Sequence, residues 1–452
     1  MNNQEAVRDA RTLGVPKMLI LGLQHMFAMF GATILVPIIV SSQYGLPLSV
    51  QTTLFFAGIG TLFFHLCAKL KVPAFLGSSF AFLGGFEAVS KLDSGRFAGM
   101  EAAEKLQYAC GGIVVAGLLY LVLALLVKVV GVHKVMRFLP PVVTGPIIIC
   151  IGLNLAPSAV SNAAQCWPLA LIALAVIVVF NIWGKGMFKI IPILLGVVIA
   201  YVAAIIMNAC GMTNADGSAI LNFQAVADAG FLGLPPFQIA KFDLSAILVM
   251  APIAIAAMME HIGDMSAISA TVGENFIEDP GLHRTLIGDG IATSLSAMFG
   301  GPANTTYGEN TGVLVLSRVY DPRVIRLAAI YAVVLGFIPK MSELIGSMPT
   351  AIVGGISFML YGMISAIGVR NVVENRVDFT NSRNLIIAAV ILVCGLGFGG
   401  GLTFTVGGTA ITLTSLAIAA IAGIVLNAIL PGKDYEFGSD VTDGRSADFG
   451  RY

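Results

Sequence analysis

Three carboxylates lie in stretches of sequence that are otherwise apolar or uncharged. Glu260 and Asp264 are four residues apart in AIAAMMEHIGDMSAI, and Glu309 lies in NTTYGENTG. On a helix, residues four apart share one face, so Glu260 and Asp264 are predicted to point the same way, with His261 turned about 100° from Glu260. Carboxylates accept hydrogen bonds, and in apolar surroundings at least one is expected to be protonated at times. This chemistry suits proton exchange and the binding of N–H groups.

The composition indicates which solvent surrounds these residues. The chain has 452 residues, of which 57% are hydrophobic and only 11% charged, and its mean hydropathy is +0.91. A soluble domain has about 25% charged residues. Continuous apolar runs such as 18–40 and 167–183 approach or exceed the roughly 20 residues that span a bilayer, and they do not alternate as barrel strands do. The sequence therefore predicts an all-α polytopic membrane protein.

Other features narrow the class further. The formal net charge is zero, which argues against nucleic acid as a partner. The six cysteines form no CxxC motif and are interpreted as small core residues rather than disulfides or metal ligands. No cofactor and no metal are expected.

The apolar runs predict fourteen transmembrane segments. They are 18–40, 46–68, 74–90, 107–130, 139–157, 167–184, 187–209, 245–270, 284–300, 304–318, 325–342, 349–369, 384–400 and 408–430. Lysines and arginines are concentrated in alternate loops, whereas 158–166, 301–303 and 401–407 hold none. Because such residues favour the inner side of a membrane, both termini are predicted to be cytoplasmic. The polar tail 433–452 is predicted to be disordered.

The two halves of the chain resemble each other. FLPPVVTGPIIICIGL (138–153) aligns with SMPTAIVGGISFMLYG (347–362), and PAFLGSSFAF (73–82) corresponds in order to PANTTYGEN (302–310). Seven segments in each half is an odd number, so the second half must enter the membrane with the opposite orientation. An inverted repeat is typical of secondary transporters, whose binding site lies near the middle of the membrane at the repeat interface.

The third and tenth segments are predicted to be interrupted helices. Both begin with proline and place glycine and hydroxyl residues at mid-depth, where irregular backbone is tolerated only if it lines a cavity or is buried in protein. Packing of helices through small residues explains Gly77 and Ser78 but leaves Asn304, Glu309 and Asn310 without an explanation. The helix N-termini that follow such breaks direct positive partial charge at the cavity.

A flat heterocycle with N–H groups beside carbonyls fits these groups. Carboxylates would accept from its N–H groups, backbone N–H groups would donate to its carbonyls, and Phe80 or Tyr307 could cover its faces. An inorganic anion would require Lys or Arg at mid-depth, where the sequence has none. A small neutral amide or a cation remains compatible with the composition.

Four motifs resemble one known family over about residues 15–430. They are QHMFAMFGATILVP (24–37), VPAFLGSSFAF (72–82), EHIGD (260–264) and NTTYGENTGVLVLSR (304–318), and they are similar to motifs of the nucleobase–ascorbate transporters. The family signature is matched by Glu309, Asn310 and Gly312, then Ser317 in place of threonine, then Arg318. In this family a glutamate opening the signature is typical of uracil transporters, and glutamine of xanthine or urate transporters.

The resemblance implies roles for individual residues. Glu260 and Glu309 would accept the N–H groups of uracil, while backbone near Phe80 and Gly308 would donate to its carbonyls. Further roles are implied by position in the motifs: Ala32 and Tyr307 in the pocket lining, and His25, Ser79 and Asn310 in support. The candidates for proton coupling are Glu260, Asp264 and Asp289, which are ionisable residues within predicted membrane segments. Acids at both Asp264 and Asp289 are also found in xanthine members, so a purine substrate stays open, although Glu309 favours uracil.

The resemblance also implies a domain organisation. The predicted parts are an N-terminal tail (1–17), a core domain (18–135 and 241–345), a gate domain (136–240 and 346–432) and a C-terminal tail (433–452). It further implies fourteen segments in two inverted repeats, a homodimer formed largely through the gate domains, contact with membrane lipid and location in the plasma membrane.

The sequence therefore predicts a symporter that imports uracil with a proton by alternating access. The alternatives are a xanthine or mixed purine and pyrimidine carrier, coupling to Na⁺ instead of H⁺, a channel, and a membrane enzyme. The enzyme would use Glu260, Asp264 and Asp289 to hold a metal, and it is disfavoured because two of these lie on one helix and no third ligand motif accompanies them. Asp289 is as compatible with structural pairing as with a relay, and His25 and His261 are interpreted as fixed hydrogen-bond donors between helices.

Overall fold

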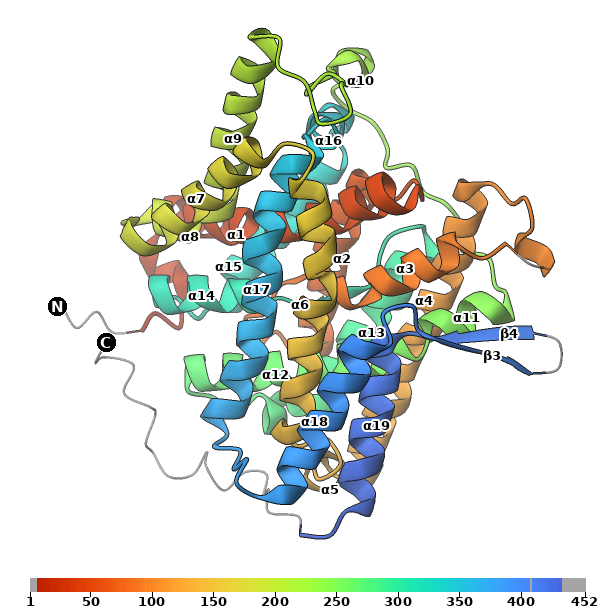
Figure 1. The fold of residues 1–452 in the computed structure, drawn as a ribbon. Helices are drawn as coiled ribbons and strands as arrows, with labels where there is room; N and C mark the ends of the chain where they lie inside the picture. The colour runs from red at the N-terminus through yellow and green to blue at the C-terminus, as the bar shows by residue number, and fades with distance from the viewer. Residues whose placement is uncertain (1–5, 94, 407–408, 433–452) are drawn as a thin grey trace.

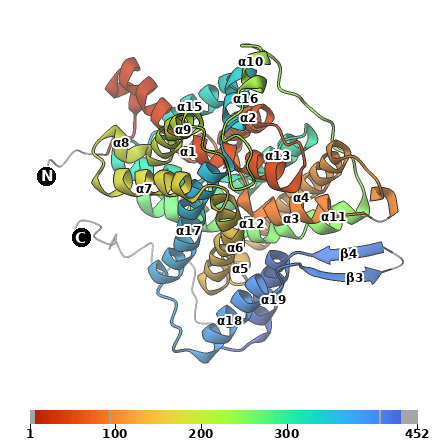
Figure 2. The same ribbon diagram turned by 45° about the horizontal axis from the view of Figure 1, so that its top comes forward.

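The computed structural model describes residues 6–93, 95–406 and 409–432, and most of these residues are helical (Figures 1 and 2). The α-helices are α1 (Val15–Tyr44), α2 (Val50–Cys67), α3 (Leu83–Ser90), α4 (Ala102–Val130), α5 (Val132–Met136), α6 (Pro141–Ala163), α7 (Trp167–Trp183), α8 (Met187–Ile190), α9 (Pro192–Ala209), α10 (Gln224–Asp228), α11 (Leu244–Met250), α12 (Ile253–Val272), α13 (Leu282–Met298), α14 (Gly308–Ser317), α15 (Pro322–Gly336), α16 (Pro339–Gly346), α17 (Thr350–Glu374), α18 (Ser382–Gly397) and α19 (Ser415–Ile429).

Short elements complete the fold. They are the 3₁₀ turns η1 (Ala10–Leu13), η2 (Phe80–Phe82) and η3 (Gly95–Phe97), the π turn η4 (Ile277–Gly281), and the strands β1 (Leu76–Ser78), β2 (Asn304–Thr306), β3 (Leu402–Val406) and β4 (Thr409–Leu413). The C-terminal tail predicted at 433–452 lies outside the described residues.

The described helices are those of a multi-pass membrane protein. By length and composition, seven of them, with α11 and α12 taken together, are long and apolar enough to cross a membrane. The count rises to eight if α15 and α16, which are bent by 86° at a short break, form one span. Four shorter apolar helices stand beside them. The predicted total of fourteen segments stays a prediction.

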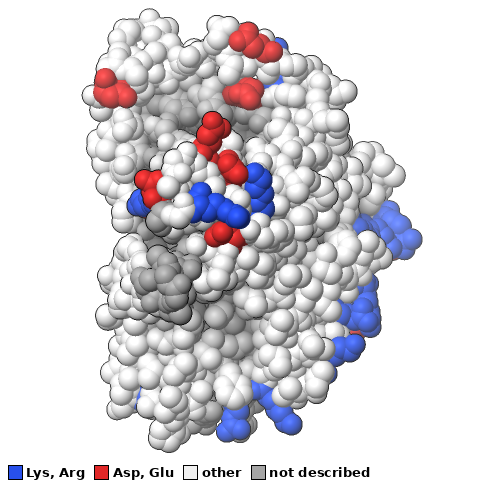
Figure 3. Space-filling model, turned by 90° about the vertical axis from the view of Figure 1, so that its right-hand side faces the viewer, with Lys and Arg blue, Asp and Glu red and all other residues white. Residues whose placement is uncertain are grey.

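The surface of the protein agrees with a lipid environment. Figure 3 shows one face, on which charged side chains gather in a few groups and broad uncharged surface lies between them. Many exposed side chains on the helices are large and apolar, for example Trp183 on α7 at 68% exposure and Val129 on α4 at 74%. Such surface is stable in hydrocarbon because lipid tails do not penalise it as water does.

Helices α6 and α17 form a central antiparallel pair (Figures 1 and 2). Their backbones approach closely, because a Cβ atom on Gly145 would lie 3.1 Å from the Gly368 carbonyl oxygen and one on Gly354 would lie 2.3 Å from the Ala163 nitrogen. Only glycine allows this approach. The sequence predicts these two helices to be counterparts in an inverted repeat, and counterparts related in that way are expected to run antiparallel.

The helices pack in two groups. Helices α7, α18 and α19 pack on the α6–α17 pair or on each other, whereas α2, α4, α13 and α15 pack on one another, with α1 against α15. Helix α12 contacts α6 of the first group and α4 of the second and so lies where the groups meet, and it also contacts α14. The predicted assignment of these groups as gate and core domains concerns their movement and stays a prediction.

Strands β1 and β2 meet in the interior, with Leu76 opposite Thr306 and Ser78 opposite Asn304 in an antiparallel register. All six of their residues are buried. Each strand leads directly into a short helix, β1 into η2 and α3, and β2 into α14. The two polar segments that the sequence predicts to be counterparts therefore hydrogen-bond to each other.

The C-terminal part differs from the sequence-based boundaries. The sequence predicts the last apolar segment over 408–430, but Thr409–Leu413 forms strand β4, which pairs with β3, and helix α19 begins only at Ser415. The hairpin projects from the helices (Figures 1 and 2). β-Branched residues such as Thr403, Thr412 and Val406 favour strands over helices. An average of hydropathy over the segment does not detect this preference.

The N-terminal segment is docked rather than free. Val7 and Val319 form a parallel bridge in which Val7 N–H donates to the Arg318 oxygen and Tyr320 N–H to the Val7 oxygen, both at 2.9 Å. Ala10 N–H donates to the Asp321 carboxylate at 2.7 Å, and Ala10 is fully buried. Residues 7–13 thus lie against the connection between α14 and α15, within the range predicted as a tail (1–17).

Candidate substrate-binding cavity

A small cavity lies where the two groups of helices meet. Six of its residues belong to η2, α12, β2 and α14 or join them, and three belong to α6 and α17. The lining residues are Phe80, Glu260, Asp264, Thr306, Tyr307 and Gly308 on one side and Ile148, Ile364 and Ile367 on the other. The cavity offers about 20 Å³ to the centre of a water molecule, which is room for a water but not for an organic ring. The walls must separate before a larger molecule can enter.

Helix α12 carries both carboxylates of the cavity. Glu260 and Asp264 are one turn apart and line the same space, as the spacing of four residues predicts. Asp264 is 5% exposed. Because ionised carboxylates are costly in such surroundings, each needs a proton, a hydrogen-bond donor or a ligand with N–H groups.

The N-terminus of α14 faces the same carboxylates. Gly308 is its first residue, and a Cβ atom there would lie 3.5 Å from Asp264 Oδ1 and 3.1 Å from Ile367 Cδ1. The first N–H groups of a helix have no partner within the helix, and they attract carbonyl oxygens and anions. The cavity therefore offers hydrogen-bond acceptors on α12 and donors at the start of α14.

The rings of Phe80 and Tyr307 form the aromatic walls of the cavity. The Phe80 ring also packs edge to face against the Tyr361 ring, with centroids 5.9 Å apart. The Tyr307 hydroxyl donates to the Ser78 oxygen at 2.9 Å, so it fastens α14 to strand β1. Its ring would lie 2.4 Å from a Cβ atom on Gly77, which only glycine at that position tolerates. Tyr307 can therefore cover a bound ring while its hydroxyl remains engaged with protein.

A polar network lies behind the cavity. Thr306 donates its hydroxyl proton to Asp264 Oδ2 at 3.0 Å. His261 Nδ1 lies 2.8 Å from Asp289 Oδ2, and both side chains are fully buried. His261 Nε2 lies 3.0 Å from the Thr285 hydroxyl, and that hydroxyl donates its own proton to the Leu282 oxygen at 3.0 Å.

These contacts place the His261 ring between Asp289 at Nδ1 and Thr285 at Nε2. The Thr306 hydroxyl lies 3.5 Å from the same Nδ1. Because Thr306 also donates to Asp264, it connects the buried His261–Asp289 pair to the cavity. Asp289 is thus placed as the structural partner of His261, one layer behind Asp264.

The predicted site residues are distributed unevenly. Phe80, Glu260, Asp264, Tyr307 and Gly308 all line the cavity. Four others are buried away from the lining, namely Ala32 and His25 on α1, Ser79 before η2, and Asn310 on α14. Glu309 lies in the first turn of α14, but its side chain is outside the part of the chain that the structure describes.

The supporting residues have their own contacts. The Asn310 amide lies 3.5 Å from the His25 oxygen, and Ser79 N–H donates to the Ala303 oxygen at 2.8 Å. Within the described residues, neither ring nitrogen of His25 has a hydrogen-bond partner. This differs from the expectation that His25 donates between helices, although the side chain is fully buried.

Asn304 has a structural explanation that the sequence did not reveal. Its amide donates to the Phe56 oxygen at 3.2 Å and to the Ala292 oxygen at 3.3 Å, so it joins β2 to helices α2 and α13. Asn304, which the packing of small residues left unexplained, therefore has backbone oxygens as hydrogen-bond acceptors and needs no ligand.

Sequence reasoning missed four lining residues. Thr306 lies within NTTYGENTG, two residues before Gly308. This position in the interrupted segment is the sequence feature that could have identified it as a lining residue. Ile148, Ile364 and Ile367 carry no such signal, because isoleucine is common throughout these helices. Among the described residues, no three His, Cys, Asp or Glu side chains gather as a metal site would require.

Comparisons with known proteins identify relatives along almost the whole chain. The family model described as "Permease family" matches residues 16–401. The chain is 40% identical to a uracil permease of Bacillus caldolyticus over 94% of both chains, and 41% identical to a uracil permease of Bacillus subtilis over 90% of this chain and 91% of that one. Among solved structures, the transmembrane domain of a cyanobacterial bicarbonate transporter, BicA, superposes with a TM-score of 0.63 at 17% identity, covering 88% of this chain and 99% of that domain. The last likeness concerns the fold alone.

Proposed function

The chain belongs to this permease family, the nucleobase–ascorbate transporters, and from that premise we propose that it imports uracil together with a proton by alternating access. The predicted family resemblance is confirmed, and the relatives support a nucleobase transporter rather than a channel or an enzyme. The identity of the nucleobase, the coupled ion and the mechanism are the content of the proposal.

One observation carries it: a cavity that places acceptors, donors and flat walls around a space between two groups of helices. Uracil has two N–H groups and two carbonyls and no net charge. Glu260, with Glu309 on α14, would accept from the N–H groups, while backbone N–H groups near Phe80 and Gly308 would donate to the carbonyls. The rings of Phe80 and Tyr307 would cover the pyrimidine, with Ala32 further back on α1.

The small volume of the cavity supports movement of the two groups against each other. Phe80, Glu260 and Gly308 lie in the predicted core domain (18–135 and 241–345), and Ile148 and Ile364 in the predicted gate domain (136–240 and 346–432). Separation of these walls toward one side of the membrane and then the other would admit and release the substrate. The isoleucines would seal the site between those steps by excluding water.

Binding of the coupled proton would neutralise the charge of the site before the loaded core domain moves. An uncompensated charge that crosses the membrane changes the energy by about 2.3 kcal/mol per 100 mV. Proton binding at Glu260, or shared with Asp264, would remove that charge on the loaded carrier. Asp289 would act through its pair with His261, which fixes the position of the groups behind Asp264.

Uptake by the purified protein tests the proposal. We expect proteoliposomes with an acidic exterior to accumulate labelled uracil in a saturable manner and to stop when the pH gradient is collapsed. Unlabelled uracil should compete more strongly than xanthine. Stronger competition by xanthine would establish the alternative purine carrier, which the acids Asp264 and Asp289 leave open. Accumulation that follows a Na⁺ gradient would identify Na⁺ as the coupled ion instead of H⁺.

Glu309→Gln tests the choice of substrate. Glutamine keeps one acceptor oxygen but loses the negative charge and presents an NH₂ donor toward the N–H groups of uracil, so uracil binding should weaken by about 10- to 100-fold. Glu343→Gln on the exposed surface of α16 is the matched control and should bind as the unchanged protein does. Uracil affinity that survives Glu309→Gln would refute this role.

The remaining proposals concern the assembly. We infer a homodimer formed largely through the gate helices, in contact with lipid of the plasma membrane, with both termini cytoplasmic. Mass measurement in lipid nanodiscs would detect the dimer. Cysteines introduced at Arg8 and in the tail 433–452 should react with an impermeant reagent only in inverted vesicles.

A further inference from the structure

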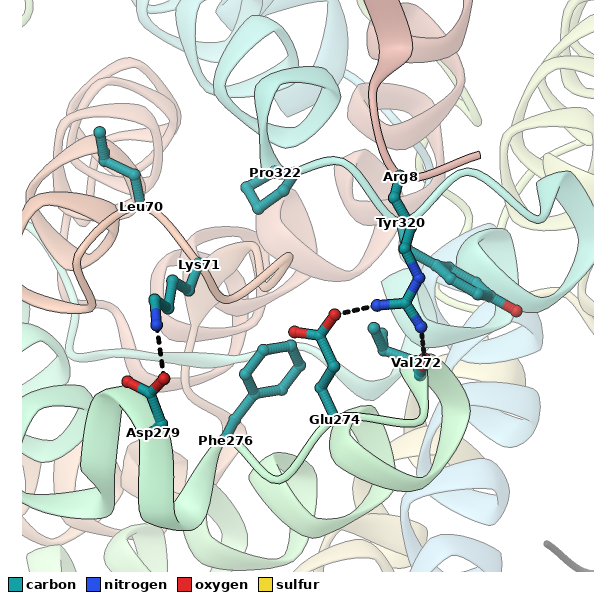
Figure 4. Close-up of a pocket in the computed structure, with 9 residues that line it drawn as sticks. All are labelled: Arg8, Leu70, Lys71, Val272, Glu274, Phe276, Asp279, Tyr320 and Pro322. Carbon is teal, nitrogen blue, oxygen red and sulfur yellow. Dashed lines mark hydrogen bonds and ion pairs between the residues drawn. The ribbon is translucent and has the colours of Figure 1, made fainter. Parts of the chain in front are cut away.

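A second and larger cavity lies at the other end of the helices that carry the acids. It has a volume of about 260 Å³ and is bordered by the N-terminal segment, the α2–β1 turn, the connection from α12 to α13 and the connection from α14 to α15 (Figure 4). Its residues are Arg8, Leu70, Lys71, Val272, Glu274, Phe276, Asp279, Tyr320 and Pro322. The proposed transport cycle makes no use of it.

Charges of both signs face each other across this cavity. Arg8 pairs with Glu274, and Lys71 pairs with Asp279 (Figure 4). The two cations enter from the N-terminal segment and the α2–β1 turn, whereas both carboxylates belong to the connection between α12 and α13. Two positive and two negative groups make the lining neutral overall, so a simple anion or a simple cation gains little net attraction there.

Both ion pairs are open to exchange. The four side chains are between 45% and 63% exposed. Pairs in that environment contribute little to stability because water solvates both partners well. A ligand that offers one anionic and one cationic group can replace both pairs with equivalent contacts, at little energetic penalty.

Unusual backbone surrounds the cavity. Lys69 and Leu70 are consecutive non-glycine residues with φ of 54° and 61°, and Arg318, whose oxygen accepts from Val7, has φ of 54°. Non-glycine residues rarely adopt this conformation, and surrounding contacts must hold them there. At the α2–β1 turn this conformation places both Leu70 and Lys71 at the border of the cavity, with Lys71 pointing toward Asp279 (Figure 4).

Apolar surface continues from the cavity along α2. Leu70 at the rim is 46% exposed, and Leu66, one turn earlier in the chain, is 65% exposed. The positive-inside pattern places the loop of Lys69 and Lys71 at the cytoplasmic surface of the membrane. The cavity therefore combines charged groups at headgroup level with an adjoining surface suited to an acyl chain.

We propose that this cavity binds the phosphoethanolamine headgroup of a membrane lipid. The phosphate lies between Arg8 and Lys71, and the ammonium lies between Glu274 and Asp279. A primary ammonium has three N–H donors for these carboxylates, whereas a trimethylammonium has none. The site should therefore select phosphatidylethanolamine over phosphatidylcholine, although both are zwitterions, and over the anionic phosphatidylglycerol.

Lipid binding to the full chain tests the proposal. The purified protein is placed in nanodiscs of phosphatidylcholine alone, or with added phosphatidylethanolamine or phosphatidylglycerol, and bound lipid is counted by native mass spectrometry. We expect a preference of about fivefold for phosphatidylethanolamine over phosphatidylcholine. Equal binding of the two, or a preference for phosphatidylglycerol, would overturn the proposal.

Variants separate this site from other lipid contacts. The double variant Glu274→Gln and Asp279→Asn removes the two negative charges that pair with the ammonium and should abolish the preference. The control is Glu87→Gln with Lys91→Gln, which removes a comparable exposed pair on α3 and should keep it. A preference that persists in the first variant would contradict the assignment.

A soluble probe distinguishes a lipid from a free headgroup. Glycerophosphoethanolamine should compete with the lipid only weakly if the chain contacts at Leu66 and Leu70 contribute, and Leu70→Ser should then lower lipid binding while leaving the soluble probe unchanged. Full competition by the soluble probe would mean that the site serves a free metabolite instead. Because none of these measurements uses uracil, failure here leaves the proposed transport function untouched.

Discussion

Helices α12 and α14 run from one cavity to the other, but the charged side chains are buried behind the inner cavity and exposed around the outer one. Helix α12 supplies Glu260 and Asp264 to the inner cavity and ends beside the outer one at Val272, and α14 begins at the inner cavity and ends near the outer one. His261 and Asp289 are fully buried behind the inner site, whereas the four charged groups of the outer cavity are about half exposed. Burial makes the inner partners fixed and costly to remove, and exposure makes the outer partners exchangeable.

The largest predicted effect comes from breaking the buried pair. His261→Ala leaves Asp289 in the interior without its partner, and loss of one member of a buried pair destabilises a protein by about 3–5 kcal/mol. Thermal unfolding in detergent should show a clear drop in stability. A variant as stable as the unchanged protein would mean that the contact with His261 does not stabilise Asp289 in the interior.

Glu260→Gln is expected to separate function from stability. The glutamine side chain keeps the size of the glutamate but lacks its charged acceptor, so uracil binding should fall by about 10- to 100-fold. Proton-driven accumulation should be lost, while thermal unfolding stays near that of the unchanged protein. If accumulation persisted, the coupled proton would move to Asp264.

Thr306→Val examines the link between the cavity and the network behind it. The hydroxyl that donates to Asp264 is lost at nearly constant volume, and water in the cavity can replace it in part. We expect a loss of about 1 kcal/mol in the free energy of unfolding and a shift in the pH profile of uptake. Thr306→Ser restores the donor and should restore the profile, which a purely steric effect would not predict.

The smallest effect lies in the outer cavity. The Lys71 ammonium hydrogen-bonds to the Asp279 carboxylate and holds its pKa below the ordinary value of 3.8. A lowered pKa means that the pair contributes fully above pH 3.8 and is lost as the pH falls toward the folded-state value. Lys71→Gln should raise the pKa toward 3.8, as measured by NMR of labelled aspartate. No change would show that the pair does not persist in solution.

The helical membrane class and the acids of the inner site followed from the sequence because hydropathy and helical spacing are local properties. Glu260 and Asp264 share a face for this reason. The correspondence of PAFLGSSFAF with PANTTYGEN predicted two matching interrupted segments, but their pairing as strands β1 and β2 was not predicted. Polar residues in apolar sequence are conspicuous, and those predicted on α12 and at the start of α14 line one cavity.

What the sequence could not supply depends on contacts between distant segments. Asn304 had the character of a ligand-binding residue, yet its amide is satisfied by backbone of α2 and α13. The isoleucines that close the cavity are indistinguishable from lipid-facing ones until the helices are packed. The residues of strands β3 and β4 are as apolar as those of a membrane helix. Their preference for strand takes effect only because the two segments pair with each other.

The docked N-terminal segment has a consequence for the timing of synthesis. Ala10 bonds to Asp321, 311 residues later in the chain, so this contact cannot form until most of the protein has left the ribosome. At roughly 5–20 residues per second, that delay is roughly 15–60 s. During this interval residues 7–13 lack their partner in the connection between α14 and α15. A segment made early therefore docks late, and a nascent chain that is cut short before Asp321 would leave residues 7–13 undocked and open to proteases.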